Sequence, residues 1–219
     1  MSAASTLVTE GHFRYLAART TPEDSFLKEL RLEAERAGLP PIHVAPEQGS
    51  FMRILLALTG AREVVEVGTL AGYSAVWMAR AGARVTTIEY LEKHAAFAER
   101  WIAKSDVADR IRVRRGAGKD VLPTLADSSM DAAFLDADKA GYPGYLKECL
   151  RIVRPGGLIM ADNAFAFGEL FSEAPQDREV QAVRDFNDLV ARTPGLRAII
   201  VPIGDGLWVG VSEMTRSFC

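Results

Sequence analysis

The chain has 219 residues, of which 48% are hydrophobic and 25% charged, so it is long enough to bury a substantial core without disulfides or structural metals. Its 26 basic and 29 acidic side chains give a formal net charge of -3, which argues against a global attraction to nucleic acid or to an anionic membrane. No stretch approaches the roughly 18 apolar residues of a membrane span, and the first residues lack the basic start and apolar stretch that are typical of a signal peptide. We therefore expect a soluble, cytoplasmic protein whose partner is a small molecule.

The first 60 residues predict two helices. Thr21 is a candidate N-cap with Pro22 at the first helical position, and Gly38 with the prolines after it closes that segment. A second helix is expected to begin near Pro46 and to stop at Thr59 and Gly60. We expect one domain over residues 1–219, in which a helical lead-in (1–60) precedes an α/β core (61–219).

Short β-rich runs alternate with helical stretches from Glu63 onward. The runs are EVVEV (63–67), RVTTIE (84–89), IRV (111–113), DAAFLD (131–136) and GLIMAD (157–162). Strands that alternate with helices indicate a doubly wound, parallel sheet with helices on both faces. The last two runs, RAIIVPI and LWVGVSE, are separated only by Gly204–Gly206, which is too short for a parallel crossover, so they predict an antiparallel hairpin. Residues 168–178 are expected to form a mobile loop.

A glycine-containing turn follows the first strand and indicates a ligand site. Gly68 and Gly72 stand where the backbone must approach a ligand closely, and Glu89 ends the second strand, where an acid accepts hydrogen bonds from ribose hydroxyls. The turn is not G-x-G-x-x-G, and the acid Glu66 would oppose a pyrophosphate but favour a cationic sulfonium cofactor. The pattern favours a nucleoside-type ligand, with a purely structural turn as the alternative.

Oxygen-donating side chains follow the fourth and fifth strands. If these strands are neighbours, Asp136, Asp162 and Asn163 converge at the carboxyl edge of the sheet. Two carboxylates and one amide favour Mg²⁺, with Mn²⁺ or Ca²⁺ as substitutes, and leave positions for the two oxygens of a vicinal diol. The alternative is that these residues only cap the helices that follow. Lys139, three residues after Asp136, is either a surface lysine or a base that takes the proton of an acceptor hydroxyl.

The motifs VAPEQGSFMRILL, VVEVGTLAGYS, FLDADKAGYPGYL, RPGGLIMADN and PIGDGLWVGV span Ile42 to Val211. Together they resemble the cation-dependent class I O-methyltransferases, the group that includes catechol and caffeoyl-CoA O-methyltransferases and their bacterial relatives. The resemblance implies a Rossmann-like, seven-stranded, mostly parallel sheet with an antiparallel last strand, and a homodimer. It also implies methyl transfer from S-adenosylmethionine (SAM) to a hydroxyl of a catechol-like aromatic acceptor.

The resemblance assigns roles to individual residues. Candidate cofactor contacts are Val44, Glu66, Gly68, Thr69, Ser74, Glu89, Ala117, Asp136 and Asp138, of which Val44 and Ala117 rest on the resemblance alone. Asp136, Asp162 and Asn163 are the candidate metal ligands, and Lys139 and Asp136 the candidate catalytic residues. One segment departs from the family pattern, because Ala164–Gly168 (AFAFG) replaces a Leu-Trp pair followed by glycine. Phe165 and Phe167 are candidates to sandwich an aromatic ring, with core or loop packing as the alternative.

Three other functions compete with this interpretation. An RNA-modifying SAM methyltransferase would share the cofactor site, and the basic run Arg110–Arg115 could touch phosphate, although its alternation first indicates a half-exposed strand. A non-catalytic SAM-binding module would not explain the oxygen ligands together with Lys139. An NAD-linked oxidoreductase would require the missing G-x-G-x-x-G pattern.

Overall fold

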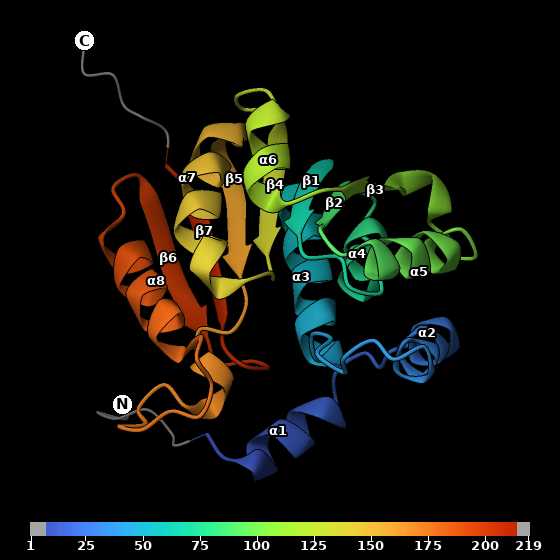
Figure 1. Cartoon of the computed structure of the whole chain (residues 1–219), viewed down its shortest axis with the longest axis horizontal. Helices are drawn as coiled ribbons and strands as arrows, with labels where there is room; N and C mark the ends of the chain where they lie inside the picture. Colours follow the sequence, from blue (N-terminus) through green and yellow to red (C-terminus); the bar gives the residue numbers. More distant parts are fainter. Residues whose placement is uncertain (1–7, 214–219) are drawn as a thin grey trace.

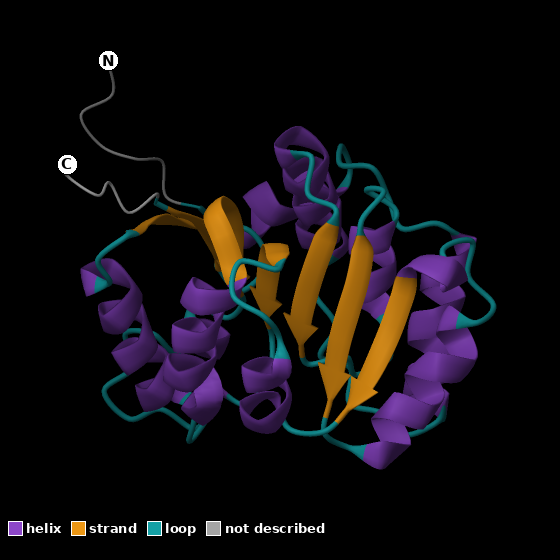
Figure 2. Cartoon of the chain, turned by 90° about the horizontal axis from the view of Figure 1, so that it is seen from above, coloured by secondary structure: helices purple, strands orange, loops and turns teal. Residues whose placement is uncertain are grey.

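A seven-stranded sheet with helices on both sides forms the centre of the computed structural model, which describes residues 8–213 (Figures 1 and 2). The strands are β1 (Glu63–Val67), β2 (Arg84–Glu89), β3 (Ile111–Arg115), β4 (Met130–Leu135), β5 (Val153–Ala161), β6 (Leu196–Val201) and β7 (Leu207–Ser212). The α-helices are α1 (Glu10–Ala17), α2 (Ser25–Arg36), α3 (Pro46–Thr59), α4 (Tyr73–Ala79), α5 (Glu92–Ile102), α6 (Gly118–Val121), α7 (Tyr142–Ile152) and α8 (Val180–Arg192).

The strand order is β3-β2-β1-β4-β5-β7-β6. Neighbouring strands from β3 through β5 pair in parallel, whereas β7 is antiparallel to both β5 and β6. This arrangement confirms the predicted Rossmann-like sheet with one antiparallel strand, and it confirms that β4 and β5 are neighbours. The carboxyl ends of β1, β4 and β5 therefore meet at one edge, where open α/β sheets bind their ligands.

Two hydrophobic cores lie on opposite faces of the sheet, because successive side chains of a strand point to opposite sides. Val64 of β1 belongs to the core formed with α2, α3, α4 and α5, whereas the next residue, Val65, belongs to the core formed with α7 and α8. Both residues are at most 1% exposed. The strands are thus buried on both faces, which explains why their sequences lack a clean alternation of apolar and polar residues.

The helical lead-in differs from the prediction at the first of its two predicted helices, α2. Helix α2 begins at Ser25 rather than Pro22, because the side chain of Asp24 caps it by accepting a hydrogen bond from the Leu27 N–H at 2.9 Å. Glu23 instead accepts hydrogen bonds from Arg31 and from the Tyr73 hydroxyl. Helix α3 has the predicted bounds, whereas α1, which buries none of its residues, was not predicted.

Other boundaries differ less. Strand β5 starts at Val153, four residues before the predicted Gly157, and a register shift in its pairing with β4 accompanies this early start. The basic run forms β3, an edge strand of partly buried and exposed residues, as predicted. Between β5 and α8 the chain is irregular apart from a short 3₁₀ turn, Ala166–Gly168. Within residues 8–213, no helix combines the length and apolarity that crossing a membrane would require.

Candidate active site

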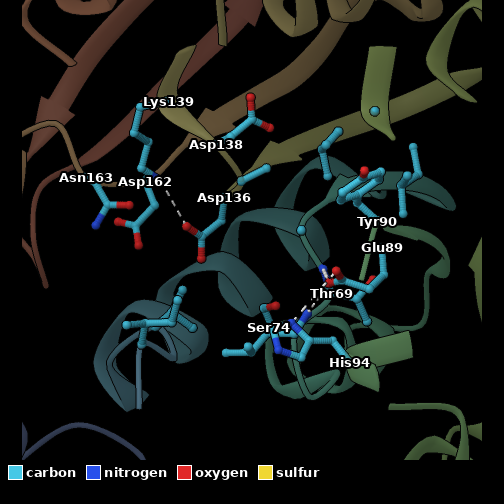
Figure 3. A pocket seen from close by; sticks show the side chains of 18 of the residues that line it. Thr69, Ser74, Glu89, Tyr90, His94, Asp136, Asp138, Lys139, Asp162 and Asn163 are labelled. Atoms are coloured by element: carbon cyan, nitrogen blue, oxygen red, sulfur yellow. Dashed lines mark hydrogen bonds and ion pairs between the residues drawn. The ribbon is translucent and has the colours of Figure 1, made fainter. Parts of the chain in front are cut away.

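A cavity of about 1090 Å³ opens at the carboxyl edge of the sheet. Its wall includes eleven of the twelve candidate site residues: Val44, Gly68, Thr69, Ser74, Glu89, Ala117, Asp136, Asp138, Lys139, Asp162 and Asn163. Figure 3 shows two groups within it, with Lys139, Asp136, Asp162 and Asn163 on one side and Thr69, Glu89, Tyr90 and His94 on the other. The cavity therefore joins the predicted nucleoside site to the predicted oxygen-ligand site.

Gly68 is required by the sheet itself. Its φ is +100°, and a Cβ at this position would lie 1.8 Å from the backbone oxygen of Asp136. Since the backbone conformation and the contact each disfavour a side chain, only glycine lets the ends of β1 and β4 approach so closely. The prediction placed a glycine here for approach to a ligand, whereas the structure gives contact with the neighbouring strand as a sufficient reason.

Glu89 organises the turn as well as lining the cavity. Its carboxylate accepts backbone N–H bonds from Thr69 (3.2 Å), Leu70 (2.9 Å) and Leu91 (2.8 Å). A carboxylate has about four acceptor positions, so these three bonds leave capacity for one ligand hydroxyl. For Glu89 to bind both hydroxyls of a ribose, as predicted, the two hydroxyls must share one acceptor position, or one of the three backbone hydrogen bonds must break.

Glu66 is the one candidate that does not line the cavity. Its side chain is 0% exposed and accepts a hydrogen bond from Ser74, which itself lines the cavity, while its second oxygen has no hydrogen-bond partner. Burial raises the pKa of Glu66 to about 8. In the cofactor-free protein burial thus favours the neutral carboxyl at neutral pH, and the predicted contact of Glu66 with a sulfonium cofactor stays a prediction.

The raised pKa of Glu66 predicts a pH-dependent stability. Because this pKa exceeds the unfolded value of about 4.3, the Glu66 contribution is most favourable below pH ~4 and is lost as the pH rises to about 8. A Glu66→Gln variant lacks this loss, so we expect it to be more stable than wild type by roughly 3 kcal/mol at pH 7 and by much less at pH 5. Denaturant unfolding across this range measures the difference. Exposed Glu173→Gln is the control, and parallel pH profiles for wild type and Glu66→Gln would contradict the assignment.

Asp136 and Asp162 form the acidic side of the cavity. They directly follow β4 and β5, and Asp162 is 7% exposed. Burial, followed by repulsion from Asp136, raises the pKa of Asp162 to about 7. Burial also raises the pKa of Asp136, although Lys139 opposes this effect. Two carboxylates that disfavour each other's charge, beside the amide of Asn163, are a donor set of hard oxygens that suits a divalent cation such as Mg²⁺.

Lys139 is buried, which the sequence left open. It is 4% exposed, and its Nζ lies 2.7 Å from the Tyr142 hydroxyl and 3.3 Å from Asp136 Oδ1. The Tyr142 hydroxyl in turn donates to the Leu135 carbonyl at 3.1 Å, so it accepts from the lysine. A lysine amine held inside a cavity next to a carboxylate is not the usual surface lysine. Tyr142, one helical turn after Lys139, was missed, although its spacing was a usable signal.

Two further partners of the oxygen ligands were also missed. Gln48 of α3, which is 1% exposed, donates from Nε2 to Asp162 Oδ1 at 2.5 Å. Asp205, in the turn between β6 and β7, accepts from Asn163 Nδ2 at 3.0 Å. These contacts join parts of the chain that are 114 and 42 residues apart, so no local sequence motif predicts them.

The segment Ala164–Gly168 places its two phenylalanines differently. Phe167 lines the cavity and is 41% exposed, whereas the ring of Phe165 packs against Gly206, where a Cβ would lie 2.9 Å from it. Ala166 and Phe167 both have positive φ, +53° and +60°, a conformation that is uncommon outside glycine. Of the two alternatives that the sequence left open, packing therefore applies to Phe165, and only Phe167 faces the cavity.

Comparisons with known proteins agree with this site. The model of the O-methyltransferase family matches residues 17–212. The catechol O-methyltransferase of Niastella koreensis is 38% identical over 197 residues, 87% of each chain, and that of Mycobacterium tuberculosis is 35% identical over 200 residues, 90% of each chain.

A solved structure is similar over most of the chain. The O-methyltransferase from Bacillus cereus in complex with SAH has a TM-score of 0.83 at 35% identity, covering 93% of this chain and 97% of that one. Fold, family model and relatives agree over nearly the whole chain, which overturns the oxidoreductase alternative. This chain belongs to the family of SAM-dependent O-methyltransferases.

Proposed function

We propose that this enzyme transfers the methyl group of SAM to one hydroxyl of a catechol-like aromatic acceptor, and that the reaction requires a divalent cation held by Asp136, Asp162 and Asn163. The observation that carries the proposal is the convergence of these three oxygen donors with the buried amine of Lys139 on one side of the cavity (Figure 3). The two relatives named as catechol O-methyltransferases support the acceptor class.

The residues of the cavity have separate roles in this proposed reaction. Lys139 Nζ, as the unprotonated amine, accepts the proton of the acceptor hydroxyl. The hydroxyl oxygen then forms a bond to the methyl carbon while the C–S bond breaks and its electron pair remains on sulfur, giving S-adenosylhomocysteine. When bound, the cation supplies the positive charge that lowers the pKa of the hydroxyl from about 10 and aligns two vicinal oxygens. Phe167 provides an aromatic wall for the acceptor ring, and the enclosed site supplies alignment.

The charges around the cavity count against an RNA acceptor. Its wall carries six carboxylates, those of Glu89, Asp136, Asp138, Asp162, Glu179 and Asp205, and two lysines, Lys119 and Lys139. Arg115 of the basic run is paired with Glu92 and Glu99 on the surface. An acidic cavity repels a polyphosphate chain, so a small neutral or cationic acceptor is favoured.

We also propose that the chain is one domain and that it forms a homodimer. Light scattering measures the oligomeric state.

Metal-dependent turnover is the direct test. We expect purified protein with SAM, catechol and Mg²⁺ to give methylated product by mass spectrometry, and addition of a chelator to abolish it. Resorcinol, whose hydroxyls are not adjacent, is the matched acceptor and is expected to react at a small fraction of the rate. Product that forms equally well with chelator would contradict the metal requirement. Absence of product from any vicinal diol, despite SAM binding, would contradict the acceptor class.

A further inference from the structure

The turn between β6 and β7 contacts Asn163, a candidate metal ligand, and Gln48, which donates a hydrogen bond to another candidate ligand, Asp162. Asp205 accepts from the amide of Asn163, and a Cβ on Gly204 would lie 2.3 Å from the side-chain oxygen of Gln48, whose amide nitrogen donates to Asp162. The turn therefore contains the hydrogen-bond partner of one oxygen donor, Asn163, and packs against the partner of another, Asp162. The sheet order explains this, because β7 lies directly beside β5, whose end carries both donors.

One oxygen of Asp205 serves two different donors. Oδ2 accepts from Asn163 Nδ2 at 3.0 Å and from the backbone N–H of Phe167 at 2.8 Å. A carboxylate can only accept, so the atom of Asn163 that faces Asp205 is the amide nitrogen, and the amide oxygen is left for the cavity. Figure 3 shows that oxygen on the side of Asp162. The same contact fixes the backbone of Phe167, the aromatic wall of the cavity.

The Asp205 side chain is not needed to close its own turn. The turn is closed by the N–H of Gly206, which donates to the carbonyl of Ile203 at 3.0 Å. Two backbone bonds, from Ala164 to Gly206 and from Phe165 to Asp205, each 2.9 Å, already hold the neighbouring segment in place. The carboxylate therefore adds a specific orientation of Asn163 and Phe167 to a connection that the backbone maintains without it.

We infer that Asp205 is a positioning residue, which orients the Asn163 amide oxygen toward the cation and holds the Phe167 wall of the acceptor site with the same carboxylate oxygen. This inference rests on the proposed function. Groups that orient a metal ligand typically change metal affinity 10- to 100-fold when removed. Because one oxygen holds both partners, the affinity for the cation and the KM for the acceptor are expected to change together.

Binding of Mn²⁺ alone, followed by electron paramagnetic resonance and calorimetry, tests the inference without turnover. We expect Asp205→Ala to weaken Mn²⁺ binding about 10- to 100-fold, with the affinity for SAM within threefold of wild type. Asp205→Asn keeps an oxygen that can accept both bonds and is expected to stay within about fivefold of wild type. Asp185→Ala, which removes an exposed carboxylate of α8, is the control for net charge, and thermal melting confirms that each variant is folded.

The outcomes separate the two proposals. Equal Mn²⁺ affinity in wild type and Asp205→Ala would overturn the positioning role and leave the proposed function intact. Equal weakening in Asp205→Asn and Asp205→Ala would also overturn it, because the charge rather than the orientation would then matter. Absence of Mn²⁺ binding by the wild-type protein would overturn the metal-dependent function itself, and this inference with it.

Discussion

Replacing Asp162 by alanine is expected to abolish metal-stimulated methyl transfer while SAM binding stays within about threefold of wild type. Asp162 lies on the side of the cavity opposite Thr69 and Glu89, so its loss removes a proposed ligand of the cation without touching the turn of the proposed cofactor site (Figure 3). Since even groups that only orient a ligand change metal affinity 10- to 100-fold, loss of the ligand itself should exceed about 100-fold. Calorimetry with SAM and with Mn²⁺ measures the two affinities separately.

Unfolding is not expected to explain the loss of activity in this variant. Burial and the charge of Asp136 raise the pKa of Asp162 to about 7, so the ionised carboxylate is itself unfavourable in the cation-free protein. Asp162→Asn is the matched control, because it keeps an oxygen for the bond from Gln48 and removes only the charge. Metal-stimulated turnover that persists in Asp162→Ala, or SAM binding that falls as steeply as metal binding, would contradict the assignment.

The residue placements that the sequence predicted correctly are those at the ends of adjacent strands. Asp136, Asp162 and Asn163 could be brought together because the alternation of strands and helices predicted that β4 and β5 are parallel neighbours, and register then fixes which residues meet at the edge. The same reasoning predicted the hairpin of β6 and β7, because three residues cannot make a crossover. Both inferences use only the order of strands and helices along the chain and the lengths of the connections between them.

What the sequence could not predict depends on the direction of a side chain or on distant contacts. Glu66 follows the strand alternation that sends it toward Ser74 at the start of α4, rather than out of the end of β1 into the cavity. Gln48 and Asp205 reach the oxygen donors from the lead-in and from the last hairpin. The start of α2 was misplaced because two capping signals overlap, and Asp24 rather than Thr21 takes the cap.

Replacing Lys139 by methionine is expected to lower kcat by about 10²- to 10⁴-fold, the range of a positioned general base, while metal binding is kept or becomes tighter. Methionine retains most of the side-chain volume in a position that is 4% exposed, and Tyr142 still donates to the Leu135 carbonyl. Because the amine lies 3.3 Å from Asp136, its loss also removes a group that, when protonated, competes with the proposed cation for that carboxylate. Single-turnover kinetics and Mn²⁺ calorimetry measure the two effects.

The arginine variant at this position separates proton transfer from charge. Arginine stays protonated in proteins, so Lys139→Arg keeps a positive charge near Asp136 but cannot take a proton from the acceptor. If Lys139 is the base, Lys139→Arg is expected to be as slow as Lys139→Met although it remains folded and binds SAM. Recovery of the rate in Lys139→Arg would mean that the lysine acts through its charge, and the proton would then have to leave by another group. The two substitutions together therefore decide whether the buried amine performs chemistry or only balances Asp136.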